Sequence, residues 1–131
     1  MAMSIQEMRS SIQTLVERDE ELRKAYVYLD QMIDWSVNDT FNILVLLDEL
    51  KKRMKEEVTH FVFRKKDGSV RQAYGTRASE VIVRHEGTVL PPDDRKPRPN
   101  SGTFPYFDIE RQSWRCFKID SLMDIDRGYT I

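Results

Sequence analysis

The spacing of the hydrophobic residues changes near residue 57 of the 131-residue chain. Before this point, apolar residues recur every three or four positions, and neither Gly nor Pro interrupts them. After it, the period becomes two, and all five Gly and all five Pro occur there. A period near 3.6 is typical of helices and a period of two of strands. The pattern therefore predicts a helical part, 1–57, followed by a strand-and-turn part, 58–131.

The first predicted helix has a seam of apolar residues that runs in steps of three and four from Ile5 to Ile33. This is heptad spacing, and Asp19 is the one polar residue in the seam. Ser4 and Glu7 have the spacing of an N-terminal capping box. Two interpretations follow: the helix packs on its own domain, or it forms an intermolecular coiled coil whose register Asp19 helps to fix.

A second helix is predicted from Thr40 to Glu57, because Ser36–Thr40 is rich in residues that favour helix caps. Its first half, Phe41–Leu47, is apolar on nearly every side, and its second half is highly charged. Such an apolar segment must be covered on several sides. We therefore expect an antiparallel helical hairpin whose surplus apolar surface favours a homo-oligomer or a protein partner.

The second part of the chain contains short segments with strand periodicity and turn residues between them. The predicted strands are 58–64, 70–76, 104–108 and 113–118. Asp67-Gly68 forms the first hairpin turn, because Gly supplies the positive φ that such turns require. Residues 86–102 contain four of the five prolines and predict a long, mobile loop. These short strands and tight hairpins predict a small antiparallel barrel.

Charge is balanced over the whole chain, with 21 Lys and Arg against 22 Asp and Glu, which excludes a histone-type nucleic-acid binder. It is unevenly spread: residues 1–57 carry 8 basic against 12 acidic side chains, and residues 58–131 carry 13 against 10. One Cys and two His exclude a zinc finger and an intramolecular disulfide. The longest apolar run, Ile43–Leu47, is far too short to cross a membrane, and the N-terminus lacks the features of a secretory signal. We expect a cytoplasmic protein without membrane contact.

No catalytic motif emerges from the sequence. His85-Glu86 lacks the second histidine of a zincin, and the acidic residues near the C-terminus lack the Glu that closes a calcium loop. We expect His60 to be a half-buried strand residue and Cys116 a buried small hydrophobic one. The sequence thus predicts no enzyme, no metal site and no cofactor.

Basic side chains accompany aromatic ones in the predicted barrel, a combination suited to neutralising phosphates and stacking bases. Solubilising charge over an aromatic core is the alternative interpretation. Arg115 shares strand parity with Phe117, so we expect it to be partly buried and to need an acceptor: a ligand phosphate, or internally Asp108 or Asp120. The predicted ligand-binding residues are Arg71, Tyr74, Trp114, Arg115 and Lys118.

Two segments resemble a known family. Residues 106–122, which include Trp114-Arg115-Cys116-Phe117 followed by Asp120, resemble the end of a WYL domain. Residues 61–76 are similar to the WYL-like, Sm/SH3-type β-barrel family of short bacterial and phage proteins. The resemblance covers roughly residues 58–123, although the Trp-Tyr-Leu tripeptide is missing and Ser121 replaces the usual Arg.

The resemblance implies an SH3-like barrel and a ligand- or nucleic-acid-sensing module of regulators, often linked to phage defence. Arg115 and Lys118 match basic positions of the motif, and Tyr74 and Trp114 match aromatic ones. The predicted fold is therefore α+β, with an N-terminal helical hairpin (1–57) followed by a small antiparallel SH3-like β-barrel (58–131).

We expect a non-enzymatic regulatory or accessory module whose barrel binds nucleic acid or a nucleotide-like ligand and whose helices self-associate or dock a protein. The alternative is a protein–protein interaction factor, phage-encoded and active in counter-defence, in which the barrel serves only as a scaffold.

Overall fold

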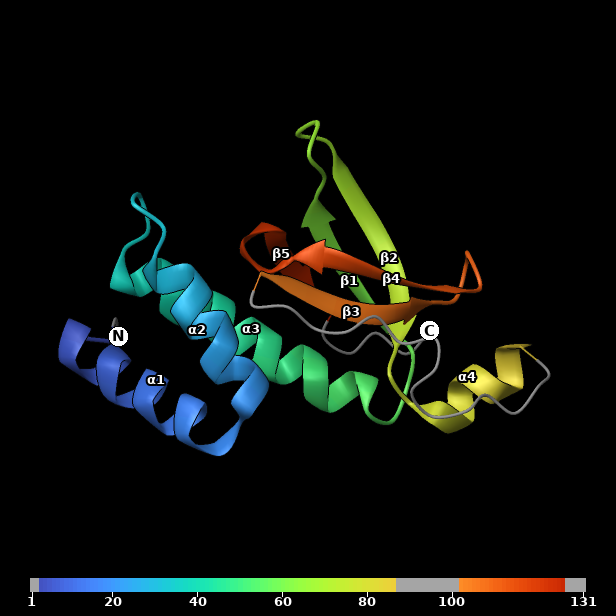
Figure 1. Cartoon of the computed structure of the whole chain (residues 1–131), viewed down its shortest axis with the longest axis horizontal. Helices are drawn as coiled ribbons and strands as arrows, with labels where there is room; N and C mark the ends of the chain where they lie inside the picture. The colour runs from blue at the N-terminus through green and yellow to red at the C-terminus, as the bar shows by residue number, and fades with distance from the viewer. Residues whose placement is uncertain (1–2, 87–101, 127–131) are drawn as a thin grey trace.

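The computed structural model describes residues 3–86 and 102–126. In these ranges, three helices precede a β-hairpin, a fourth helix and three further strands (Figure 1). The helices are α1 (Ile5–Arg18), α2 (Glu20–Asp30), α3 (Val37–Met54) and α4 (Ser79–Glu86). The strands are β1 (Thr59–Arg64), β2 (Val70–Thr76), β3 (Thr103–Asp108), β4 (Ser113–Lys118) and β5 (Leu122–Ile125), with a 3₁₀ turn, η1 (Ile119–Ser121), before β5. No helix in the described ranges has the length and apolar character needed to span a bilayer.

The single long helix predicted from Ile5 to Ile33 is wrong, because the chain breaks at Asp19. Asp19 adopts an extended conformation (φ −140°, ψ 114°) and ends α1. Its carboxylate accepts hydrogen bonds from the backbone N–H groups of Glu21 and Leu22, so it also caps the start of α2. The polar residue in the heptad seam is therefore a helix boundary and not a register device of a coiled coil.

The other helix ends follow local signals more closely. Ser4 and Glu7 form the predicted capping box at the start of α1. A second capping box, between Ser36 and Asp39, begins α3 three residues before the predicted start at Thr40. Asp39 replaces the usual Glu at the third helical position, and this shorter carboxylate still accepts the Ser36 N–H at 3.1 Å.

The five strands form one antiparallel sheet in the order β4-β3-β2-β1-β5. This arrangement confirms the α+β prediction, and the β1–β2 hairpin projects beyond the rest of the sheet (Figure 1). Gly68 has φ +87° in the tip of that hairpin, as its Asp-Gly turn predicts. Sequence reasoning missed β5, which has only four residues and pairs with β1 across more than 50 positions of the chain.

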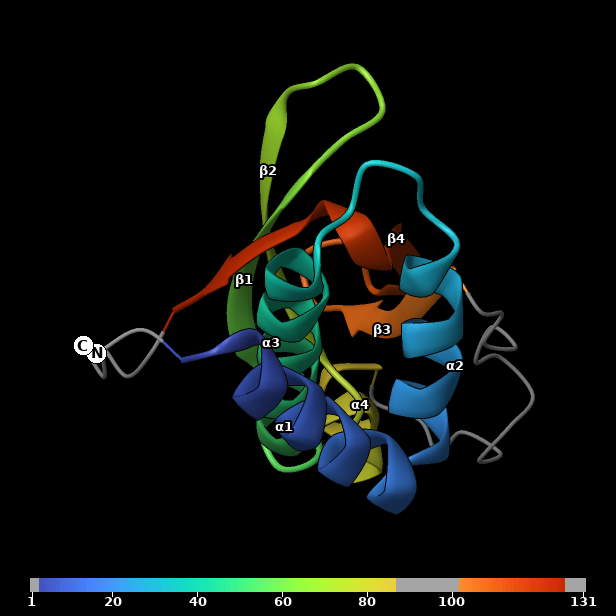
Figure 2. The same cartoon turned by 90° about the vertical axis from the view of Figure 1, so that its left-hand side faces the viewer.

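The helices and the sheet share one hydrophobic core. α3 contacts α1 and α2 and also the sheet (Figure 2), so most of the apolar Phe41–Leu47 segment is covered within the chain, although Val45 is exposed. The carbonyl of Met54, at the end of α3, accepts hydrogen bonds from the Thr76 hydroxyl and the Arg77 N–H, just after β2. The predicted division between residues 57 and 58 thus falls in the short turn between α3 and β1.

The segment after β2 forms α4, whose Val81 and Ile82 are buried. The predicted loop 86–102 lies outside the described residues, apart from the ends at Glu86 and Gly102. Gly102 packs closely on Tyr28 of α2: a Cβ atom there would lie 2.9 Å from a ring carbon of Tyr28. The Tyr28 hydroxyl in turn donates to Asp120 at 2.8 Å, which ties α2 to η1.

Candidate nucleic-acid interface

Arg71 and Tyr74 lie on opposite faces of β2. The register pairs Arg71 with Phe63 of β1, and Tyr74 with His60. Phe63 belongs to the hydrophobic core, so Arg71 is on the inner face of the sheet and Tyr74 on the outer face. The Tyr74 ring stacks on His60, with ring centroids 4.7 Å apart.

Arg115 also lies apart from the other predicted residues of its strand. It pairs with Tyr106 of β3 on the inner face, whereas Trp114 and Lys118 have the opposite parity. Trp114 packs edge-on against Phe107, with centroids 5.9 Å apart. The five predicted ligand-binding residues therefore do not form a single patch: Arg71 and Arg115 are on the inner face, and the two aromatic residues are on the outer face with Lys118.

The partly buried arginine with an internal acceptor is Arg71, not Arg115, which is exposed. Nη2 of Arg71 donates to Oδ2 of Asp108 at 2.7 Å, and the exposed fractions of the two side chains are 15% and 0%. The other carboxylate oxygen, Oδ1, accepts the backbone N–H of Arg111 at 3.1 Å. Asp108 thus links β2 to the turn between β3 and β4. Strand parity could not show which of the two arginines pairs with an internal carboxylate. That pairing depends on the end of the neighbouring strand at which the carboxylate lies.

The charges of Arg71 and Arg115 both act on the side chain of Tyr106. Its side chain is fully buried, and its hydroxyl makes no hydrogen bond that meets standard geometry with the described residues. Burial, with the charge of Asp108, raises the pKa of Tyr106 to about 12, although Arg71 and Arg115 act in the opposite direction. The hydroxyl is therefore a neutral group at physiological pH, close to a cluster of charges.

Two single-residue expectations can be compared with the structure. His60 is partly buried in β1, as predicted, and its ring nitrogens lie 3.1 Å from Asp126 and 3.0 Å from Gln72. Cys116 was expected to be buried and is exposed instead. Cys116 has the same strand parity as the exposed Lys118 and lies on the face of β4 opposite to the buried Phe117.

A groove of about 720 Å³ runs between the β1–β2 hairpin and the segment from β4 to β5; we call it the hairpin groove. Its basic lining residues are Arg64, Lys65, Lys66 and Lys118. Among the described residues, the only carboxylate in the lining is that of Asp120, which already accepts the hydrogen bond from Tyr28. Phe63, Phe117, Leu122 and Met123 contribute an apolar surface. This groove has a strong excess of positive charge beside apolar side chains.

A second groove, of about 660 Å³, lies on the β2 side of the same hairpin, facing the β3–β4 turn; we call it the turn groove. Its lining comprises Lys65, Val70, Arg71, Gln72, Glu110 and Arg111. Lys65 therefore borders both grooves. Sequence reasoning selected Arg71 and Lys118 from these linings as ligand-binding residues, but not Arg64, Lys65, Lys66 and Arg111. The available signal was that these residues flank the hairpin turns.

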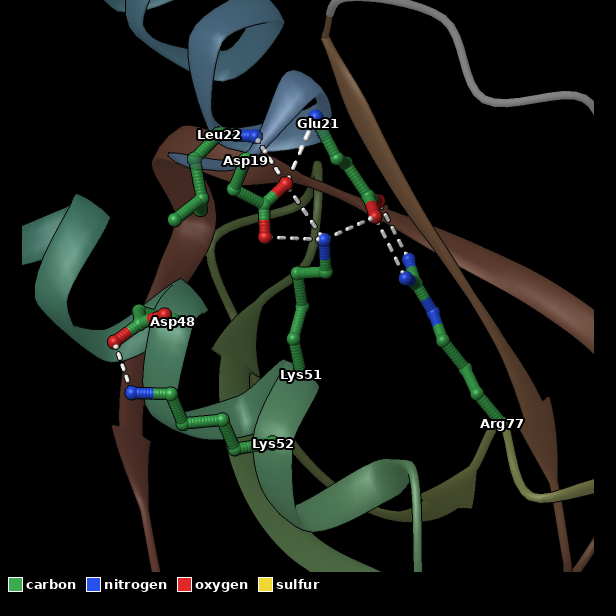
Figure 3. A network of polar contacts seen from close by, with 7 residues as sticks. All are labelled: Asp19, Glu21, Leu22, Asp48, Lys51, Lys52 and Arg77. Carbon is green, nitrogen blue, oxygen red and sulfur yellow. Dashed lines mark hydrogen bonds and ion pairs between the residues drawn. The ribbon is translucent and has the colours of Figure 1, made fainter. Parts of the chain in front are cut away.

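A different set of charges joins the helices to the barrel (Figure 3). Lys51 of α3 lies 2.7 Å from a carboxylate oxygen of Asp19 and 3.1 Å from one of Glu21. Glu21 also receives two hydrogen bonds from Arg77, at 2.7 and 2.6 Å. Burial alone would raise the pKa of Glu21, but the hydrogen bonds and charges of Arg77 and Lys51 outweigh it and lower the pKa to about 2. These groups satisfy one another and form a structural junction.

Comparisons with known proteins agree with the fold. The family model for WYL_2, described as an Sm-like SH3 beta-barrel fold, matches residues 47–123. The chain is also 32% identical over 77 residues to a protein of Enterobacteria phage T4 named "Uncharacterized 11.5 kDa protein in Gp31-cd intergenic region". That match covers 59% of this chain and 74% of the phage protein. No solved structure matches the chain. The family match begins inside α3, so it includes the second half of that helix as well as the strands.

Proposed function

The chain belongs to the WYL_2 family of Sm-like SH3 barrels, and we propose that it is a non-enzymatic regulatory or accessory module that binds nucleic acid or a nucleotide-like ligand through its phosphates. The observation that carries this proposal is the hairpin groove, where the described part of the chain places four basic side chains and one carboxylate that is already hydrogen-bonded. Phosphate contacts supply most of the affinity of such interfaces and fix the position of the ligand.

The alternative, that these charges only keep the protein soluble, fits the groove less well. Within the described residues, the side chains of Lys66 and Lys118 form no ion pair, whereas Lys51, Lys52 and Arg53 of α3 all do. The groove also carries apolar side chains among its cations. Phe63, Phe117 and Leu122 are nearly buried beneath it, whereas Met123 is 42% exposed and can pack against a base.

The test is a salt titration with a single-stranded oligonucleotide, followed by fluorescence anisotropy. For single strands, log K falls with log salt concentration by about 0.7 per phosphate contact. Replacing both Lys66 and Lys118 by Ala should weaken binding and reduce that slope by about 1.4.

The matched control removes the same charge elsewhere, with Lys24→Ala and Lys55→Ala on the exposed surface of the helices. This variant should keep the wild-type slope. An equal loss in both double variants would mean that only net charge matters. If the wild type binds neither oligonucleotides nor nucleotides at low salt, the proposal fails, and the alternative of a protein-interaction factor with a scaffold barrel takes its place.

A further inference from the structure

We propose that the hairpin groove and the turn groove are two parts of one binding track, whose ligand is a single strand of several nucleotides and not a mononucleotide or a duplex. This inference rests on the proposed function and makes it more specific. It depends on how the two grooves are connected, which groups point into the turn groove, and what shape of ligand could occupy both.

The two grooves are connected through the hairpin and along β4. Lys65 borders both of them, one from the β1 side and the other from the β2 side. Arg111 precedes β4 at the turn groove, and Lys118 ends β4 at the hairpin groove. Arg115 lies between them on the inner face of the strand. At roughly 3.3 Å per residue, β4 alone extends over about 17 Å, which is longer than one nucleotide.

The turn groove contains an arginine that is held in place without being fully used. A guanidinium has five N–H donors, and Arg71 uses one of them on Asp108. It makes no other hydrogen bond to the described residues, and it lines the groove. The same carboxylate fixes the backbone of Arg111, so one buried group positions both walls. An arginine whose rotamer is already fixed loses little entropy when it binds a phosphate.

The shape of the site favours a single strand. The β1–β2 hairpin projects beyond the rest of the sheet (Figure 1). The two grooves share Lys65 of this hairpin, so a ligand in both must bend around that residue. Duplex DNA has a persistence length of about 50 nm and resists such a bend. In a single strand the bases are also free to pack against Met123, the exposed apolar side chain of the hairpin groove.

The experiment is a length series: thymidine monophosphate, oligothymidylates from about 4 to 16 nucleotides, and a duplex of the longest length, all titrated at low salt. Affinity should increase with length until both grooves are filled and then level off, and the duplex should bind more weakly. Arg111→Ala keeps the backbone N–H that bonds Asp108, so the fold should survive. It should weaken the long oligonucleotide by roughly tenfold, as expected for one charge-assisted contact, and leave the mononucleotide unchanged.

The controls separate this inference from the proposed function. Lys118→Ala should weaken ligands of every length, and Lys24→Ala none of them. If oligonucleotides bind but affinity does not rise with length, or Arg111→Ala has no effect while Lys118→Ala does, the site is the hairpin groove alone and the track is refuted. If the duplex binds as tightly as the single strand, the single-strand assignment is wrong. Absence of binding by every ligand would instead refute the proposed function.

Discussion

The junction between helices and barrel and the hairpin end of the barrel both concentrate charge, but they treat it differently. At the junction, Asp19, Glu21, Lys51 and Arg77 form a closed network, with each charge opposite a partner (Figure 3). At the hairpin end, cations outnumber the carboxylates that could neutralise them. Charge density alone therefore does not identify a binding surface. The informative property is whether the partners are already present within the chain.

The junction also connects distant parts of the sequence in a way that suits a structural role. Arg77 donates to Glu21 and to the carbonyl of Pro105, and its guanidinium lies 3.8 Å from the centroid of the Phe104 ring. One side chain thus joins α2, the end of β2 and β3. All three nitrogens of the Arg77 guanidinium thus donate a hydrogen bond within the chain. Among the described residues, the lysine side chains of the hairpin groove make no hydrogen bond or ion pair.

Arg71 differs from the lysines of the barrel grooves because it pairs with a buried carboxylate. Its removal should have the largest effect on the free energy of unfolding. Arg71→Ala leaves the carboxylate of Asp108, which is fully buried, without its cation. Loss of one partner from such a buried pair costs about 3–5 kcal/mol. Urea denaturation should show this loss of unfolding free energy. The double variant Arg71→Met with Asp108→Leu should recover much of it, because no buried charge then remains. Full stability of Arg71→Ala would show that the pair of Arg71 and Asp108 makes no net contribution to the stability of the fold.

The junction gives the next largest effect, through pH. The pKa of Glu21 is about 2 in the folded protein, against an ordinary value of 4.5. A lowered pKa stabilises the folded state fully above the unfolded value, and this stabilisation is lost as pH falls through the folded value. The protein should therefore lose about 3 kcal/mol of unfolding free energy between pH of about 4.5 and about 2 because of this group.

Glu21→Gln tests this assignment, since it removes the titration but keeps the size of the side chain. The variant should be less stable at neutral pH and should show a flatter stability profile over the acid range. Chemical denaturation followed at several pH values gives both quantities. If the free energy of unfolding of Glu21→Gln falls with pH as steeply as that of the wild type, other carboxylates cause the loss of stability in acid.

Sequence reasoning was most successful where structure is decided locally. The Ser4–Glu7 capping box, the Gly68 turn and the bounds of β2 and β4 all follow from residues a few positions apart. The break at Asp19 was missed because heptad spacing continues on both sides of it, so periodicity alone cannot show that its carboxylate caps α2. Hydrophobic patterns record which face is buried, not where one helix ends and the next begins.

The site was predicted less completely because its geometry depends on long-range pairing. Arg71 and Asp108 are 37 positions apart, and they meet only because β2 pairs with the end of β3. The sequence correctly indicated that an inner-face arginine would need an acceptor, but assigned this to Arg115. Likewise, the grooves arise where separate hairpins approach one another, which strand parity does not describe.

Self-association through residues 1–57 stays a prediction, and the structure shows where to test it. Leu22 is buried in the core of its own chain, so its replacement by Asp would unfold the protein and not only separate subunits. Ile33 is 97% exposed and offers a cleaner variant. If the helices form a dimer that covers Ile33, Ile33→Ser should weaken it by about 1–2 kcal/mol, seen by light scattering over a concentration series. A wild-type mass of 15.5 kDa at micromolar concentration would exclude the dimer.

The smallest expected effect on stability is also the sharpest test of the contrast between the two charged regions. Lys66 and Lys118 are exposed and unpaired within the described residues, so replacing either by Ala should change the unfolding free energy by less than about 0.5 kcal/mol. Removing one cation from a surplus of positive charge can even stabilise the folded protein slightly, because the remaining cations repel one another less. Thermal melts at low and high salt should show this, with any gain confined to low salt. A loss of 2 kcal/mol or more, comparable with the effect of breaking a buried pair, would place these lysines in a structural network like that of the junction and remove the reason for assigning them to a ligand.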